Sequence, residues 1–183
     1  MRQDRAIRWL LLIYTIPAEP SRKRAFIWRE LKKAGAVYLR DGVCALPEQE
    51  ATGPIVRSLA AKIDELGGQA TLVVGAELEP PRSEAIVAAA RMARAEEYRE
   101  IAREAQAFLD HIGQETEHRD FTFAEMEGLE ADVGKLRRWN EQVQARDYFG
   151  VEESAGVSDL LRQCEEALGA FEATAFHKDQ AAR

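Results

Sequence analysis

The chain has 183 residues, 46% of them hydrophobic, which is enough to fill the core of one domain or of one compact domain with a helical extension. Its longest apolar run, residues 9–16, is far too short to cross a bilayer, so we expect no membrane partner. Residues 16–20 continue as folded protein rather than as a cleavage site, which makes the cytoplasm the expected location. Cys44 and Cys164 form no C-x-x-C pair, and we expect both to be small core residues rather than disulfide or metal ligands.

The formal net charge of −7 is unevenly distributed along the chain. Residues 1–47 contain ten Lys or Arg and four Asp or Glu, a net +6, whereas residues 48–183 carry a net −13. A basic segment can attract a polyanion locally, but the acidic remainder would repel DNA that wrapped around the whole molecule. Any nucleic-acid contact is therefore expected to be small.

The first 79 residues alternate between strand and helix patterns. Residues 7–16 are apolar on both alternating faces, which predicts a central strand that is covered above and below. A helix is predicted from Pro20 or Ser21 to about Ala34, where Gly35 ends it.

A hairpin and a second helix complete this part of the chain. Strands are predicted at residues 36–39 and 43–46 because Asp41-Gly42 between them is a strong hairpin-turn signal. Residues 55–66 have helical spacing, and residues 70–74 read as a strand. The pattern predicts an α+β fold in which residues 1–79 form a ferredoxin-like βαββαβ domain with strand order 4-1-3-2 or a close variant.

Residues 80–183 are predicted to form a three-helix extension packed on this domain. Ser83 is the expected cap of a helix that runs to about Ile112, Thr122 to Glu125 form a capping box, and Ser158 is the expected cap of the last helix. The apolar stripes are expected to pack on one another and on the second face of the sheet. Coiled-coil dimerisation through the same stripes, with Asn140 in the seam, is the alternative.

Several segments resemble the amino-terminal domain of the chromate-resistance regulator ChrB. They are residues 9–22, 27–33, 35–43, 121–125, 135–139 and 145–150. The resemblance implies a transcriptional regulator of chromate-efflux genes whose first domain is generally followed by a second domain with Cys and His residues. Because the sequence ends at Arg183, we do not expect it to sense chromate alone, and a separate second-domain protein is an expected partner.

The first half is also similar, more distantly, to the small CRISPR-associated ferredoxin-like nuclease and to the middle domain of the phenylacetate-pathway repressor. Those relatives pair through the sheet, which implies a homodimer here. In the nuclease an aspartate at the end of the first strand can hold a metal, but Thr15 stands at that place and lacks the negative charge that Mg²⁺ needs. We therefore expect no catalytic residue, no metal and no cofactor.

The candidate DNA-binding residues lie on the first predicted helix. At 100° per residue Arg22, Phe26, Arg29 and Lys33 share one face, opposite an apolar side with Ile27, Trp28 and Leu31. The complete candidate set adds Lys23 and, beside the hairpin turn, Arg40. An ordinary solvated face with Phe26 packed under the extension is the alternative, and Arg24 is expected to pair with a carboxylate inside the fold.

A second group of residues has the spacing of metal ligands, but the sequence argues against a metal site there. His111, Glu115 and His118 are spaced by four and three residues and would share a helical face if the helix continued past Gly113. Gly113 and the polar residues after it predict that the helix ends instead, so no metal site is predicted. No nucleophile triad or phosphate-binding glycine loop is present in the sequence either.

The leading functional hypothesis is a non-enzymatic regulatory protein of the chromate or a related stress response, which acts through DNA or a regulatory partner. The first alternative is a homodimeric structural or adaptor domain that binds another protein. The second is a degenerate metal-dependent nuclease.

Overall fold

A computed structural model describes residues 6–118 and 122–181 and shows a mixed α+β protein, as predicted. The elements in chain order are β1 (Arg8–Thr15), α1 (Ser21–Lys33), β2 (Val37–Arg40), β3 (Val43–Pro47), α2 (Thr52–Glu65), β4 (Gln69–Glu77), α3 (Pro80–His118), α4 (Phe123–Gln144) and α5 (Glu153–Ala181). Two compact units are formed, a sheet unit of residues 1–92 with 146–149 and a helical unit of residues 93–145 with 150–183. The division between them falls inside α3.

The sheet has four antiparallel strands in the order β2-β3-β1-β4, which is the predicted order 4-1-3-2 read from the other edge. β1 is central, with Leu12 opposite Cys44 of β3 on one side and opposite Leu72 of β4 on the other. A central position agrees with its apolar sequence, because a strand in the middle of a sheet is better shielded from water than a strand at the edge.

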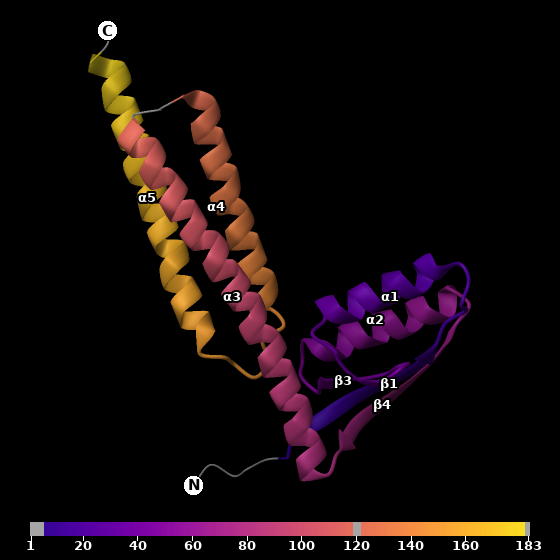
Figure 1. Ribbon diagram of the computed structural model, residues 1–183. Coiled ribbons are helices and arrows are strands. Elements are labelled where there is room, and N and C mark those ends of the chain that lie inside the picture. Colours follow the sequence, from indigo (N-terminus) through magenta and orange to yellow (C-terminus); the bar gives the residue numbers. More distant parts are fainter. Residues whose placement is uncertain (1–5, 119–121, 182–183) are drawn as a thin grey trace. The chain divides into compact units, whose positions relative to one another are not determined.

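Helices α1 and α2 cover one face of this sheet (Figure 1). Leu10 and Leu12 of β1 are buried beneath Ile27 of α1 and Ile63 of α2, and each of these four side chains is at most 1% exposed. Burying a side chain of this kind contributes roughly 1.5–3 kcal/mol, so this layer dominates the stability of the sheet unit.

The second face is covered at one end only. Trp9 is buried against Ala45 and Ile86, the last of which belongs to the first turns of α3, and the Trp9 Nε1 donates a hydrogen bond to the Ser83 Oγ at 3.1 Å. The ring of Phe149 lies 6.0 Å from that of Trp9. Farther along β1, the side chain of Ile13 is 44% exposed. The prediction of cover on both faces is therefore right at Trp9 and wrong at Ile13.

Two glycines close the predicted turns. Gly35 ends α1 with a φ of 76°, and a Cβ there would meet Arg146 and Tyr148 at 3.0–3.2 Å. Gly42 has a φ of 69° in the β2–β3 turn, and its carbonyl accepts a hydrogen bond from the Tyr14 amide at 2.7 Å. Any other residue would be strained at either position, which is why the Asp41-Gly42 signal locates the hairpin correctly.

The predicted ends of the long helices need correction. α3 begins at Pro80 rather than after Ser83, whose hydroxyl accepts from Trp9 instead of capping, and it continues through Gly113 to His118. α5 begins at Glu153, so Ser158 lies inside it and donates to the Ser154 carbonyl at 3.0 Å. The cap of α4 is confirmed, because the Thr122 side chain accepts from the Glu125 amide.

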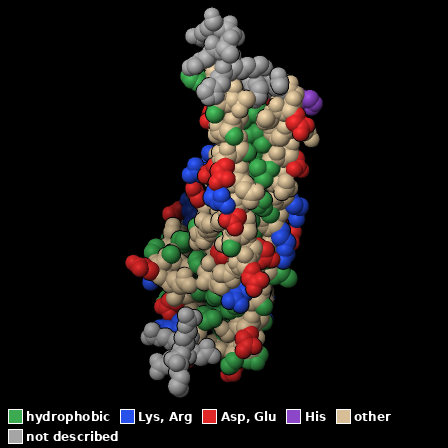
Figure 2. Space-filling model, turned by 90° about the vertical axis from the view of Figure 1, so that its left-hand side faces the viewer, with side chains coloured by type: hydrophobic (Ala, Val, Ile, Leu, Met, Phe, Trp, Pro, Cys, Tyr) green, Lys and Arg blue, Asp and Glu red, His purple; other side chains and the backbone are tan. Residues whose placement is uncertain are grey.

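The helical unit has a core built from α3, α4 and α5, as the apolar stripes predict. The buried residues are Tyr98, Ile101, Ala105, Phe108, Ile112, Leu129, Val133, Leu136, Val143, Val157, Leu161, Cys164 and Phe171. Asn140 is also buried, at 8% exposure, and its Oδ1 has no hydrogen-bond partner among the described residues. Figure 2 shows that acidic and basic side chains are interleaved on the visible surface of these helices.

Both cysteines are buried, as predicted. Burial raises the pKa of the Cys44 thiol to about 12 and that of the Cys164 thiol to about 11. The Cys164 thiol also donates to the Ala105 carbonyl at 3.5 Å. Neither sulfur is a thiolate near neutral pH, so both act as small apolar groups.

Candidate nucleic-acid interface

Helix α1 turns a buried arc toward the sheet and a cationic arc toward solvent. Ile27, Leu31 and the following Ala34 are buried, whereas Arg22, Arg24 and Arg29 are exposed. The helix carries six Lys or Arg and one acid, Glu30. Because the buried positions are aliphatic, the charged positions are left on the outer surface, as expected for an amphipathic helix.

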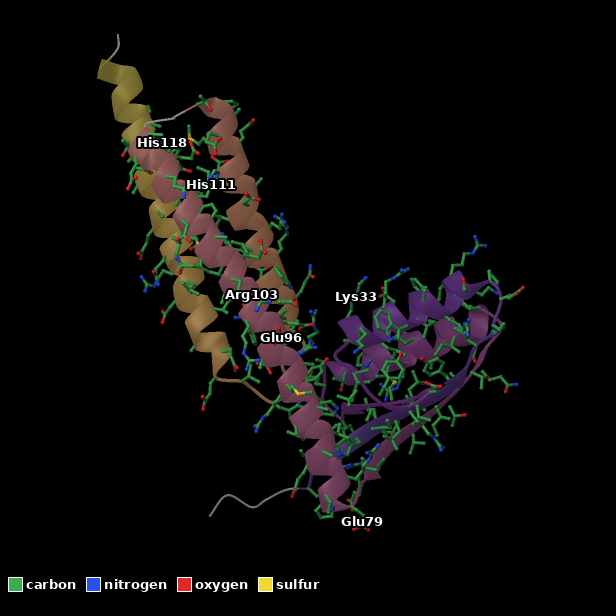
Figure 3. All side chains as sticks on the ribbon, in the orientation of Figure 1. Lys33, Glu79, Glu96, Arg103, His111 and His118 are labelled. Carbon is green, nitrogen blue, oxygen red and sulfur yellow. The ribbon has the colours of Figure 1, made fainter. Side chains whose placement is uncertain are left out.

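The predicted residues differ in their exposure and in the partners they contact. Arg22 and Arg29 are exposed, as is Lys33, which forms a 2.8 Å ion pair with Glu30 (Lys33 is labelled in Figure 3). The Lys23 Nζ donates to the Leu66 carbonyl at the end of α2, at 2.8 Å. That lysine thus joins α1 to α2.

The sequence predicts Phe26 on the exposed face of α1 and Trp28 on the buried side, and the structure shows the reverse. Phe26 is half-buried and packs against the core under α1 and α2, whereas Trp28 is 52% exposed. The Lys32 Nζ lies 5.8 Å from the centre of the Trp28 ring, a cation–π distance. Arg24 was expected inside the fold but is exposed as well. The exposed aromatic of this face is therefore Trp28, with Arg24 and Lys32 one turn away on either side.

Helical spacing alone does not decide between Phe26 and Trp28. At 100° per residue the buried side chains of Ile27, Leu31 and Ala34 centre on a direction that lies at roughly equal angles from the two aromatic residues. Which of the two is buried therefore depends on how α1 packs on the sheet and on α2, and no local pattern in the sequence carries that information.

Arg40 lies at the end of the sheet where α1 begins. It is exposed and directly precedes the Asp41-Gly42 turn, and Gly42 bonds to Tyr14 next to the end of β1. α1 starts at Ser21, six residues after β1 ends at Thr15. The chain path thus brings the hairpin turn to the same edge as the first turn of α1.

The cations of this surface are poorly compensated. Within residues 6–118 and 122–176, no ion pair joins Arg22, Arg24 or Arg29 to a carboxylate, and Lys33 alone on α1 has such a partner. We call Arg22, Arg24, Trp28, Arg29 and Lys32 the α1 outer face. Uncompensated guanidinium and ammonium groups on one rigid helix are suited to bind an anionic chain, because their charges add in the same region of solvent.

Thr15, which stands where the resemblance to the nuclease implies a metal-holding residue, is exposed at the end of β1 and pairs with Gln69 of β4. The described residues contain one group of three potential metal ligands lying close together, His111, Glu115 and Glu125. All three belong to the helical unit. Thr15 belongs to the sheet unit and is not part of this group.

The family model described as "Protein ChrB, N-terminal" matches residues 24–182. This chain belongs to that family. The match covers most of the sequence, including the α1 outer face from Arg24 onward, and confirms the resemblance seen in the sequence. Membership in the ChrB amino-terminal family indicates a role of the chromate-resistance regulator type.

No curated protein and no solved structure gave a significant match to the chain. No helix in the described residues is long and apolar enough to span a membrane.

Proposed function

We propose that this chain is a non-enzymatic regulatory protein of the chromate or a related stress response that contacts DNA through the α1 outer face. The observation that carries the proposal is the set of uncompensated cations around an exposed tryptophan on α1, in a member of a regulator family. Arg22 and Arg40, at the edge of the sheet where α1 begins, would extend the contact along a phosphate backbone. The strand order and βαββαβ sequence fit a ferredoxin-like scaffold for this helix.

The physical basis of such a contact is phosphate neutralisation. Each cation that meets a phosphate releases condensed counterions, a contribution that does not depend on base sequence. Trp28 adds a flat apolar surface that can stack on a sugar or an unpaired base. The three long helices contain more Asp and Glu than Lys and Arg, so their surfaces would disfavour a larger contact with DNA. The proposed interface is accordingly one helix wide and mainly sequence-independent.

The test is a duplex-binding titration of the full chain at low salt. Arg24→Ala with Arg29→Ala removes two outer-face cations that have no structural bond among the described residues. We expect a loss of affinity of about tenfold or more relative to the unchanged protein.

A matched double variant controls for the loss of two positive charges. Arg99→Ala with Arg162→Ala removes two exposed arginines that already pair with Glu153 and Glu166 in the helical unit. This variant should bind as the unchanged protein does. Equal affinity of both double variants, or no DNA binding by the unchanged protein, would contradict the proposal.

A homodimeric adaptor is the second candidate function, and one observation favours it. Ile13 and Val73 are 44% and 37% exposed, on the part of the sheet that α3 leaves uncovered. A second copy laid against this face would remove both side chains from water. Light scattering that gives twice the chain mass, and the chain mass for Ile13→Lys, is the expected result. A monomeric unchanged protein would exclude this candidate.

A further inference from the structure

One end of the helical unit brings an imidazole and two carboxylates together. His111 and Glu115 come from the last turns of α3, and Glu125 comes from the first turn of α4. Their ligand atoms all lie within 4.8 Å of one another. The His111 Nε2 is 3.1 Å from the Glu125 Oε1, and the His111 Nδ1 is 3.9 Å from the Glu115 Oε1. Figure 3 shows His111 on α3, with His118 nearer the end of the same helix.

Local structure explains why these three meet. α3 continues through Gly113, so His111 and Glu115 are four residues apart on one helical face. Thr122 caps α4 through the Glu125 amide and places that glutamate in the first turn. Ile112 and Leu129, which are 3% and 1% exposed, belong to the same core cluster and hold the two helices together beside the three ligands. The ligands are thus presented by regular helix and not by a loop.

We propose that His111, Glu115 and Glu125 form a site for a divalent transition metal, of which Zn²⁺ is the best fit. Zn²⁺ accepts an imidazole nitrogen and carboxylate oxygens at about 2.0–2.2 Å in a tetrahedral arrangement, in which the ligand atoms are roughly 3.4 Å apart. The three side chains supply three such atoms, and water supplies the fourth. Starting from separations of at most 4.8 Å, the set closes around an ion with side-chain movements of roughly 1–2 Å.

The donor set suits a divalent cation. The His111 ring meets a carboxylate at each nitrogen, Glu125 at Nε2 and Glu115 at Nδ1, so two negative charges converge on one imidazole. Glu115 and Glu125 are only 20% and 30% exposed at their side chains, so two negative charges are partly withdrawn from water. A divalent ion compensates both, and an imidazole ligand selects transition metals over Mg²⁺ or Ca²⁺.

An ion can reach the site from solvent. His111 is 48% exposed at its side chain and also lines a hollow of about 200 Å³, together with Glu104, Asp132 and Lys135. Two acids against one lysine give that hollow a negative balance that would attract a cation. Bound by His111, Glu115 and Glu125, the metal would link α3 to α4, independently of whether α1 contacts DNA.

The experiment is a zinc titration of the full, tag-free chain in competition with a chromophoric chelator, combined with thermal unfolding. We expect one equivalent of Zn²⁺ to bind and to raise the thermal midpoint by roughly 2–8 °C, because the ion binds the folded state. His111→Gln and Glu125→Gln should each weaken zinc binding by at least about tenfold, since loss of even an indirect supporting partner of a metal ligand has effects of this size. Circular dichroism without metal checks that each variant is folded.

Two matched variants distinguish this site from general surface binding. His118→Gln removes another exposed imidazole of α3, and Glu117→Gln removes an exposed carboxylate of the same helix; neither residue is in the cluster. Both variants should bind zinc as tightly as the unchanged protein. No zinc binding by the unchanged protein, equal binding by His111→Gln, or a loss in His118→Gln as large as in His111→Gln would overturn the assignment.

Discussion

Cations on α1 and cations on the three long helices have different surroundings. In the helical unit Arg99 pairs with Glu96 and Glu153, and Arg162 pairs with Asp159 and Glu166. On α1 the exposed arginines have no carboxylate partner in the described part of the chain, and Glu30 is the one acid of the helix. A paired cation has its charge cancelled within a few ångströms, whereas an unpaired one remains available to a ligand. The density of uncompensated charge, rather than the number of basic residues, distinguishes the two regions.

Two tryptophans, one on α1 and one on α4, should differ most in their contribution to stability. Trp139 packs against the core of the helical unit, so Trp139→Ala should lower the free energy of unfolding by about 2–4 kcal/mol. Trp28 is half exposed, and Trp28→Ala should change it by less than about 1 kcal/mol. Urea unfolding of both variants gives the two numbers. A large loss in Trp28→Ala would mean that Trp28 is a structural residue and not part of a binding surface.

Salt dependence tests whether the α1 outer face neutralises phosphates. If roughly three to five phosphates are met per protomer, log K against log salt should fall with a slope of about −3 to −4.5. Arg29→Ala should flatten the slope by about one unit, whereas Arg99→Ala, which removes a paired arginine, should leave it unchanged. The measurement is a set of duplex titrations at several salt concentrations. The same change of slope in both variants would remove the distinction between the two regions.

Removal of the one carboxylate of α1 should have a smaller and opposite effect. Glu30→Gln releases Lys33 from its ion pair and takes a negative charge from the helix, so DNA affinity should rise by about two- to fivefold at low salt. The exposed pair contributes little to folding, and the thermal midpoint should hardly move. Glu166→Gln, which breaks an exposed pair of α5, is the matched control and should leave DNA affinity as it was. A fall in affinity for Glu30→Gln would argue against phosphate binding next to Glu30.

The two thiols provide the smallest contrast, with one in the sheet unit and one in the helical unit. Burial raises the pKa of Cys44 to about 12 and that of Cys164 to about 11, both above the ordinary value of 9.0. Native protein at pH 8 should therefore react very slowly with a thiol reagent, and above pH 9 Cys164 should react before Cys44. Because the unfolded thiols ionise first, these groups contribute stability below about pH 9 that is lost as the pH rises toward 11–12. Mass spectrometry of the alkylated protein reads out the order of reaction.

The sheet unit is predictable from sequence because its signals are local and agree with one another. The continuous apolar run in residues 7–16 fixes β1, and Asp41-Gly42 fixes the hairpin through a backbone conformation that only a few residues adopt. Together they leave little freedom in the strand order. The exposed stretch at Ile13 could not be predicted, because an apolar strand looks the same whether or not a helix covers its far end.

The helix ends and the two candidate sites depend on longer-range contacts. Ser83 looks like a cap, but its hydroxyl is used by Trp9, 74 residues away. Gly113 looks like a helix end, yet a Cβ there would meet nothing within 4 Å, and the surrounding helix tolerates the glycine at about 1 kcal/mol. Glu125 joins His111 only through the packing of α4 on α3. No spacing rule in the sequence contains that information.

Residues 146–149 bear on the order in which the protein can fold. The Tyr148 hydroxyl donates to the Ala34 carbonyl at 2.8 Å across 114 residues of chain, and Phe149 lies against Trp9. Contacts between such distant residues form late, because the loop that they close must first lose its conformational entropy. During synthesis, α1, α2 and the four strands would leave the ribosome well before Tyr148 does. Until α3 and α4 have been made, the end of α1 and the ring of Trp9 would therefore remain incompletely covered.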